Sequence, residues 1–302
     1  MQIVLNQMTV LFILMAVGFI IGKVKLLTTE GNTVLSKIVL NITLPCTILS
    51  SVFENESVIT IADTAYFILM SLLAFLIAFL VSVPIVLLMG GDKANRGLLT
   101  FISVFSNCGF MGLPVALAIF GASSAYYVAL FSIIFNILVF SVGIIMISGK
   151  GGKFDPKQLI NPTLIIALLA IPIALFNLQF PFIITEVARI TGYITIPGAM
   201  LVVGSSLAYV PLKTVFSEWR VGPATALKLV AIPIVTWLVL RQIISNELLL
   251  GVLVIVSGMP TAATASMLTV GKGNEHIASA GTFLTTVLCG VTVPLIAYLL
   301  LM

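Results

Sequence analysis

Apolar residues dominate the chain in ten long runs, which short polar or charged segments separate. The runs cover residues 3–21, 33–53, 62–89, 95–120, 124–147, 161–179, 183–209, 214–240, 246–270 and 276–301. A helix needs about 20 apolar residues to cross the hydrocarbon core of a bilayer, and each run is close to that length. The pattern therefore predicts an all-α polytopic membrane protein with ten transmembrane helices.

The composition agrees with this pattern and excludes several classes of protein. Of the 302 residues, 60% are hydrophobic and only 8% are charged, and the mean hydropathy is +1.26. A soluble domain carries about 25% charged residues, so this chain cannot cover a water-facing surface. A soluble enzyme, a disordered chain and a nucleic-acid binder are excluded. We expect the lipid bilayer as a partner and no nucleic acid.

Cysteine and histidine give no sign of a metal or disulfide framework. Cys46, Cys108 and Cys289 lie inside apolar runs, and His276 is the single histidine. An odd number of cysteines in lipid argues against disulfide pairing, and one histidine without a cysteine cluster argues against a metal centre. We expect no metal and no cofactor.

The cations predict an orientation, because cytoplasmic loops are enriched in lysine and arginine. If the N-terminus lies outside, the inner loops hold ten of the fourteen cations: Lys23, Lys25, Lys93, Arg96, Lys150, Lys153, Lys157, Lys213, Arg220 and Lys272. The outer loops hold only Arg189 and Arg241, beside several acids. We expect a multi-pass protein of the cell's inner (plasma) membrane with both termini outside.

The two halves of the chain share a weak repeat. Residues 41–45 read Asn-Ile-Thr-Leu-Pro and residues 193–197 read Tyr-Ile-Thr-Ile-Pro, an offset of 193 − 41 = 152 that also relates Gly121 to Gly273. Chance is the alternative, because these residue types are abundant. Five spans per half would make the repeat inverted, an arrangement typical of transporters with a binding site near the midplane. The predicted domains are a first five-helix repeat over 1–147, a short basic cytoplasmic linker over 148–160 and a second five-helix repeat over 161–302.

Glycine and proline interrupt the fourth span of each half. The first interruption, residues 106–114, reads Ser-Asn-Cys-Gly-Phe-Met-Gly-Leu-Pro, and the second, residues 257–264, reads Ser-Gly-Met-Pro-Thr-Ala-Ala-Thr. Glycine weakens a helix and proline removes a donor, so both spans are predicted to break, with Pro114 and Pro260 beginning second half-helices. Paired breaks mark transporter binding sites, although a lone proline more often marks an ordinary kink.

The breaks favour an anion as the ligand. A half-helix N-terminus exposes free N–H groups and carries a partial positive charge, so it suits a carboxylate. The Asn107 amide and the hydroxyls of Thr261 and Thr264 lie beside the breaks. From the residues at the breaks and the polar residues of neighbouring spans, the candidate substrate-binding set is Asn107, Cys108, Gly109, Gly112, Pro114, Gly258, Pro260, Thr261, Thr264, Lys228 and Asn136.

The stretch from Asn107 to Pro114, followed by Gly121, resembles the fourth-span crossover of the auxin efflux carrier family. Further matches, which extend the resemblance over essentially the whole chain, are Asn41, Pro45, Gly258-Met-Pro260, Gly271-Lys-Gly273-Asn274 and Pro294. The family includes plant auxin exporters of the PIN type and bacterial proteins described as malate or malonate permeases. The resemblance implies ten spans in a five-plus-five inverted repeat, in which the broken helices 4 and 9 cross at the midplane. It implies an elevator motion of spans 3–5 and 8–10 against a scaffold of spans 1, 2, 6 and 7. It also implies that Asn107 contacts the substrate carboxylate, and it adds Asn41 to the candidate set.

The sequence leaves the roles of three polar residues in the spans open. Lys228 lies eight residues after Arg220, about 12 Å into span 8 at about 1.5 Å per residue; it either attracts an anion or extends its stem to the interface. Asn136 either lines a cavity or hydrogen-bonds between helices. Asp63 resembles the acidic start of span 3 in plant members, but Phe67 stands where those members carry a lysine, so an ion-pair role for Asp63 stays open.

We expect a secondary transporter of small organic (carboxylate) anions. No G-x-x-x-x-G-K-[ST] run is present, which argues against ATP hydrolysis, and no acid or histidine lies deep in a span to activate a nucleophile, which argues against an enzyme. The alternative is a non-transporting membrane sensor that binds a ligand and acts through a partner. The identity of the carboxylate, the direction of transport and coupling to Na⁺ or H⁺ stay open. A homodimer through the scaffold helices is the protein partnership that we consider.

Overall fold

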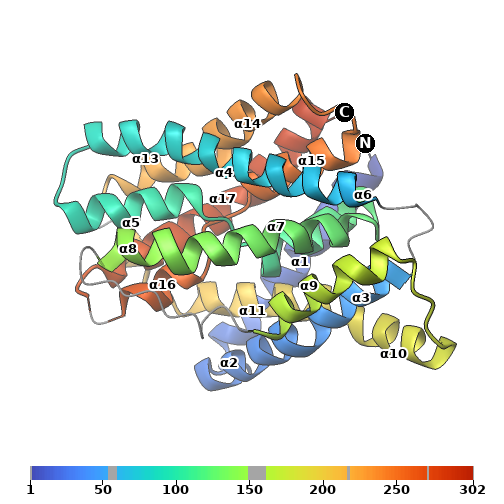
Figure 1. Ribbon diagram of the computed structural model, residues 1–302. Coiled ribbons are helices and arrows are strands. Elements are labelled where there is room, and N and C mark those ends of the chain that lie inside the picture. Colours follow the sequence, from blue (N-terminus) through green and yellow to red (C-terminus); the bar gives the residue numbers. More distant parts are fainter. Residues whose placement is uncertain (1, 54–59, 149–160, 216–217, 271, 302) are drawn as a thin grey trace. The chain divides into compact units, whose positions relative to one another are not determined.

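The computed structural model describes residues 2–53, 60–148, 161–215, 218–270 and 272–301, and in these ranges the chain is all-helical with no strand (Figure 1). Seven of the described helices are long and apolar enough to cross a membrane: Asn6–Lys23, Thr29–Phe53, Ile61–Leu88, Ser124–Ile147, Phe182–Ala208, Val221–Leu240 and Glu275–Leu301. Three shorter apolar helices, Cys108–Phe120, Pro162–Leu175 and Glu247–Ser257, lie in the predicted spans 4, 6 and 9. The chain is a multi-pass membrane protein. Ten spans, the domain bounds and the inverted repeat stay predictions, and nearly all of the linker lies outside the described residues.

The first of two compact units gathers Met1–Leu69, Gly109–Ile134 and Leu159–Tyr209. Its elements are α1 (Gln2–Lys23), α2 (Thr29–Ile38), the π-helix η1 (Val39–Thr43), α3 (Leu44–Phe53), α6 (Leu113–Phe120), α9 (Pro162–Leu175), α10 (Phe182–Gly192) and α11 (Thr195–Ala208), with most of the π-helix η2 (Cys108–Gly112) and the first parts of α4 (Ile61–Leu88) and α7 (Ser124–Leu138). α1 packs closely on α11, where a Cβ at Gly204 would lie 1.9 Å from the carbonyl oxygen of Met15. Small residues of this kind let membrane helices approach each other.

A buried threonine cluster in this unit joins the two halves of the sequence. Thr195 Oγ1 donates to Thr43 Oγ1 at 2.9 Å, and Thr47 Oγ1 lies 2.7 Å from Thr195 Oγ1. Thr43 and Thr195 are equivalent positions of the predicted repeat, 152 residues apart. Gly121 and Gly273, the other equivalent pair, have φ angles of +78° and +81°, which glycine adopts without a steric penalty. A repeat would produce both features, although neither one shows how the halves are oriented.

The second unit gathers Met70–Cys108, Phe135–Gln158 and Val210–Met302. It contains the remaining parts of α4 and α7, then α5 (Lys93–Val104), the π-helix η3 (Val139–Gly143), α8 (Ile144–Ser148), α12 (Leu212–Val215), α13 (Val221–Ala226), the π-helix η6 (Leu227–Ala231), α14 (Ile232–Leu240), α15 (Glu247–Ser257), α16 (Thr264–Thr269) and α17 (Glu275–Leu301).

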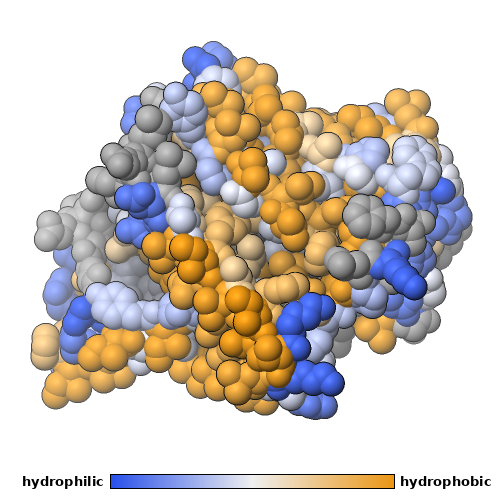
Figure 2. Space-filling model, turned by 180° about the vertical axis from the view of Figure 1, so that it is seen from behind, coloured by the Kyte–Doolittle hydropathy of each residue, from blue (hydrophilic) through white to orange (hydrophobic). Residues whose placement is uncertain are grey.

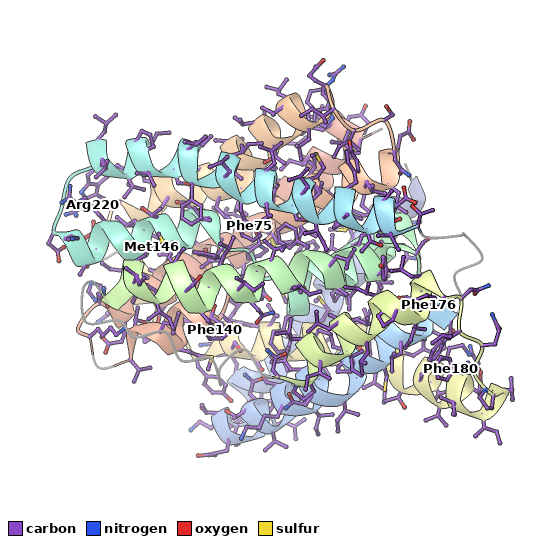
Figure 3. All side chains as sticks on the ribbon, in the orientation of Figure 1. Phe75, Phe140, Met146, Phe176, Phe180 and Arg220 are labelled. Atoms are coloured by element: carbon purple, nitrogen blue, oxygen red, sulfur yellow. The ribbon has the colours of Figure 1, made fainter. Side chains whose placement is uncertain are left out.

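α5 and α8 lie side by side, and a Cβ at Gly97 would lie 1.9 Å from the carbonyl oxygen of Met146, labelled in Figure 3. The ring of Phe105 packs 4.6 Å from that of Phe101 and 6.0 Å from that of Phe75. These contacts hold the end of α5 in an apolar environment.

Within the part of the chain that the structure describes, three π-helical turns end two residues before a proline. They are η1 before Pro45, η2 before Pro114 and η6 before Pro233. A proline lacks the N–H that would bond to the carbonyl four residues earlier, and its ring clashes with that carbonyl, so the preceding turn widens. Such turns are frequent at functional sites, and the candidate residues Asn41, Cys108 and Lys228 each lie in one of them.

Large apolar side chains are exposed along the helices, as contact with lipid requires. Leu80, Leu88 and Val291 are 65%, 87% and 71% exposed. Figure 2 shows broad areas of hydrophobic side chains, in orange, on the face that it presents. A soluble monomer rarely exposes contiguous apolar areas of this extent, so they mark the membrane-facing surface.

Candidate functional site

Both predicted breaks occur, and the two broken segments pair with each other inside the second unit. α5 ends at Val104 and α15 ends at Ser257, and extended or turn backbone follows each of them over residues 105–107 and 258–263, which we call the crossover. The N–H of Asn107 donates to the Pro260 carbonyl at 2.7 Å, and the N–H of Ala262 donates to the Phe105 carbonyl at 2.9 Å. This short antiparallel pairing satisfies backbone groups that a break within a membrane would otherwise leave without partners.

Side chains satisfy further groups at the ends of the broken helices. Thr261 Oγ1 donates to the Ile102 carbonyl at 2.8 Å, and Ser106 Oγ donates to the Ser257 carbonyl at 3.3 Å. The last carbonyls of a helix have no partner within that helix, so such donors take the place of the missing N–H groups. The Thr261 N–H in turn donates to Thr285 Oγ1 at 3.1 Å, which ties the second break to α17.

Lys228 is the basic side chain that reaches the crossover. Its side chain is fully buried, and its Nζ donates to the Val104 carbonyl at 2.9 Å and to Ser106 Oγ at 2.6 Å. The stem therefore extends inward from η6 to the end of α5, rather than outward to the interface. The alternative in which Lys228 extends its stem to the membrane interface is therefore wrong.

The candidate residues divide between the two units. The second unit contains Asn107, Cys108, Asn136, Lys228, Gly258, Pro260, Thr261 and Thr264, and the first contains Asn41, Gly109, Gly112 and Pro114. Asn107 and Asn136 are half-buried, and Asn41 is exposed. The Oγ1 atom of Thr264 is buried without a hydrogen-bond partner among the described residues, whereas the hydroxyl of Thr261 is already bonded. Of the two threonines, Thr264 has its hydroxyl available for a ligand.

The structure corrects one detail of the expected half-helices. Pro114 lies in the first turn of α6, as predicted, although the helical conformation already begins with η2 at Cys108. Pro260 does not begin the second half-helix, because α16 starts at Thr264, four residues later. The carbonyl of Pro260 instead accepts the N–H of Asn107, so this proline belongs to the paired extended segment.

Asp63 has a local structural role. Its Oδ2 accepts from Thr60 Oγ1 at 2.6 Å and from the Thr60 N–H at 3.2 Å, and its own N–H donates to Thr60 Oγ1 at 3.0 Å. This reciprocal arrangement is a capping box at the start of α4. Phe67, one turn later, is fully buried and packs 4.9 Å from the ring of Tyr127.

Comparison with known proteins shows the family. A family model described as membrane transport protein matches residues 3–158 and 156–297. The chain belongs to this membrane transport protein family. The resemblance to auxin efflux carriers, carried by the sequence from Asn107 to Pro114, is thereby confirmed. The family is one of membrane transporters and not of enzymes.

Two archaeal relatives, both described as uncharacterized transporters, align with this chain over nearly their whole length. An uncharacterized transporter of Methanocaldococcus jannaschii is 26% identical over 314 residues, which cover 99% of this chain and 100% of the relative. An uncharacterized transporter of Methanothermobacter thermautotrophicus is 23% identical over 294 residues, which cover 94% of each chain. The similarity to these transporters thus extends well beyond the crossover.

Several residues that build the crossover are not evident from the sequence. Val104, Ile102 and Phe105 act through backbone carbonyls, which any residue type provides. The π-turn that contains Lys228 does have a signal, namely Pro233 two residues after its end. Sequence reasoning interpreted such single prolines as ordinary kinks and so missed the turn.

Proposed function

We propose that this member of the membrane transport protein family is a secondary transporter of small organic carboxylate anions, which bind at the crossover. The observation that carries the proposal is the pairing of two broken helices within one unit, Asn107 with Pro260 and Phe105 with Ala262. Irregular backbone at membrane depth is tolerated where it is buried in protein or lines a cavity, and transporters use such breaks to hold substrates.

The groups at the crossover favour an anion. The amide of Asn107 lies in the paired segment of the second unit, and the hydroxyl of Thr264 lies in the same unit at the start of α16. Lys228 adds a basic amine close to the same segment, where its Nζ donates to Ser106 Oγ. A carboxylate is the small ligand that matches this combination of donors.

The division of the chain supports elevator-type alternating access. The first unit holds the helices of predicted spans 1, 2, 6 and 7, and the second holds those of spans 8–10, while spans 3–5 are divided between the two units. The scaffold spans that the family resemblance implies thus fall in one unit, and spans 8–10 of the implied moving part fall in the other. In the proposed cycle, the unit that contains the crossover carries the bound carboxylate across the membrane.

We place the protein in the inner (plasma) membrane with both termini outside, following the distribution of its cations. The membrane potential drives a monovalent anion outward with about 2.3 kcal/mol per about 100 mV, or about fiftyfold in concentration. Export of a monocarboxylate therefore needs no coupling ion, whereas uptake of a dicarboxylate needs Na⁺ or H⁺.

The test is flux and charge movement in liposomes that contain the purified protein. Malate, malonate, other short carboxylates and indole-3-acetate are tested, with the Na⁺ and pH gradients varied separately. We expect saturable flux of one acid, loss of this flux in Asn107→Ala, and wild-type flux in the matched control Asn6→Ala, which changes an exposed asparagine of α1. Absence of flux for every acid, in counterflow as well as in current, would contradict the proposal and favour a sensor.

A further inference from the structure

The environment of Lys228 resembles a cation site more than an ion pair. The chain buries this ammonium completely, and neither of the two salt bridges among the described residues involves it. A buried charge without a counter-ion is strongly destabilising unless dipoles compensate it. The compensating dipoles are a backbone carbonyl, Val104 O at 2.9 Å, and a hydroxyl, Ser106 Oγ at 2.6 Å.

The position of these oxygens strengthens the comparison. Val104 is the last residue of α5, a helix of 12 residues, so its carbonyl lies at the partially negative end of the helix. Ser106 Oγ is bonded in turn to the Ser257 carbonyl at 3.3 Å, at the end of the other broken helix. Carbonyls at unwound segments and half-helix C-termini are the ligands with which transporters hold Na⁺. Oxygen atoms are also what hard cations prefer.

The path of the side chain explains how lysine reaches this position. Lys228 is the second residue of η6, the turn that widens before Pro233, and α13 and η6 both pack against α5. On this turn the four-carbon stem extends across to the end of α5. The ammonium thus arrives from a neighbouring helix at the place where the two broken helices meet.

We propose that the Lys228 ammonium is a tethered cation that fills the cation site of the crossover, so that the carrier needs no bound Na⁺ to organise its carboxylate site. This inference rests on the proposed function, because the crossover is taken as the carboxylate site. Lys228 is then a positioning residue, which holds Val104 and Ser106 in place and supplies a fixed positive charge for the anion. In a carrier without this lysine, the same oxygens would need a free cation.

Thermal unfolding of the purified protein tests the proposal without any carboxylate. The wild-type Tm is compared in NaCl and in choline chloride at equal ionic strength, and we expect no difference. Lys228→Ala removes the ammonium and opens the space of a propylammonium ion. We expect a lower Tm that propylammonium or Na⁺ restores in a saturable manner, as ligands that bind only the folded state do, and that choline does not restore.

Two variants separate a cation site from a general loss of packing. Lys228→Met keeps the volume of the stem without the charge, so its Tm falls and propylammonium does not restore it. Lys37→Ala removes an exposed lysine of α2 and serves as the matched control, with a wild-type response to every salt. Restoration of Lys228→Met by propylammonium, or the same salt response in Lys37→Ala, would overturn the proposal.

Binding of ²²Na⁺ to the wild-type protein decides the proposal even if the Lys228 variants do not fold. We expect no saturable binding, because the lysine occupies the site; saturable binding, or a Tm of folded Lys228→Ala that no cation changes, would overturn the assignment. Carboxylate flux in liposomes is measured separately. Its absence would contradict the proposed function, while the cation measurements alone decide the role of Lys228.

Discussion

Two threonines of the second break differ in what their hydroxyls do, and this difference makes a sharp prediction. Thr261 Oγ1 donates to the Ile102 carbonyl at 2.8 Å and is fully buried. Thr264 Oγ1 has no partner among the described residues. Valine matches threonine in shape, so Thr261→Val and Thr264→Val each remove a hydroxyl with little change in packing. The first variant leaves a buried carbonyl without its donor, and the second breaks no bond within the described protein.

The expected magnitudes follow from these contacts. Thr261→Val lowers the free energy of unfolding by about 1–3 kcal/mol, the penalty of an unsatisfied buried carbonyl. Thr264→Val changes it by less than about 0.5 kcal/mol, but weakens carboxylate binding by about 1.5 kcal/mol, or about tenfold, if its hydroxyl donates to the substrate. Thermal unfolding in detergent measures the first effect, and the KM of transport in liposomes measures the second. Equal losses of stability in both variants, with equal KM values, would refute the reasoning.

Two further predictions concern stability away from the crossover. Gly97→Ala places a methyl group 1.9 Å from the Met146 carbonyl oxygen, and this overpacking lowers the free energy of unfolding by about 1–3 kcal/mol and so lowers the Tm. In the control Gly222→Ala the new methyl group meets open space, so its Tm is unchanged or higher. Equal Tm values for the two variants would show that α5 and α8 are not in close contact. Thr60→Ala removes the capping box with Asp63 and lowers the unfolding free energy by about 0.5–2 kcal/mol without changing the KM of transport; a change in KM alone would give this pair a transport role.

Much of the architecture could be predicted because a membrane imposes simple constraints. Apolar runs of spanning length give the helices, and the coincidence of glycine with proline gives the breaks. The long helices lie where the apolar runs predict them, for example Ile61–Leu88 for the run 62–89. The ends of the helices differ from the predicted ends by a few residues. For example, the sixth apolar run extends to residue 179, whereas α9 ends at Leu175.

The contacts inside the crossover could not be predicted, because they depend on tertiary pairing. The sequence marks Thr261 and Thr264 alike, and only the structure shows that Ile102 uses one of the two hydroxyls. Lys228 had two interpretations of similar weight, because its direction depends on the widened turn η6 and on the end of α5. Similarly, the start of α16 at Thr264 reflects the use of Pro260 in backbone pairing, which no local propensity encodes.

The most direct test of the central claim is calorimetric binding of the transported carboxylate to purified protein, with the crossover altered at one side chain. An amide that donates to a carboxylate contributes about 1.5–3 kcal/mol, so Asn107→Ala is predicted to weaken binding by about 10- to 150-fold. Asn6→Ala, on the exposed surface of α1, is predicted to bind as the wild type does. The same dissociation constant for all three folded proteins would contradict the placement of the carboxylate at the crossover.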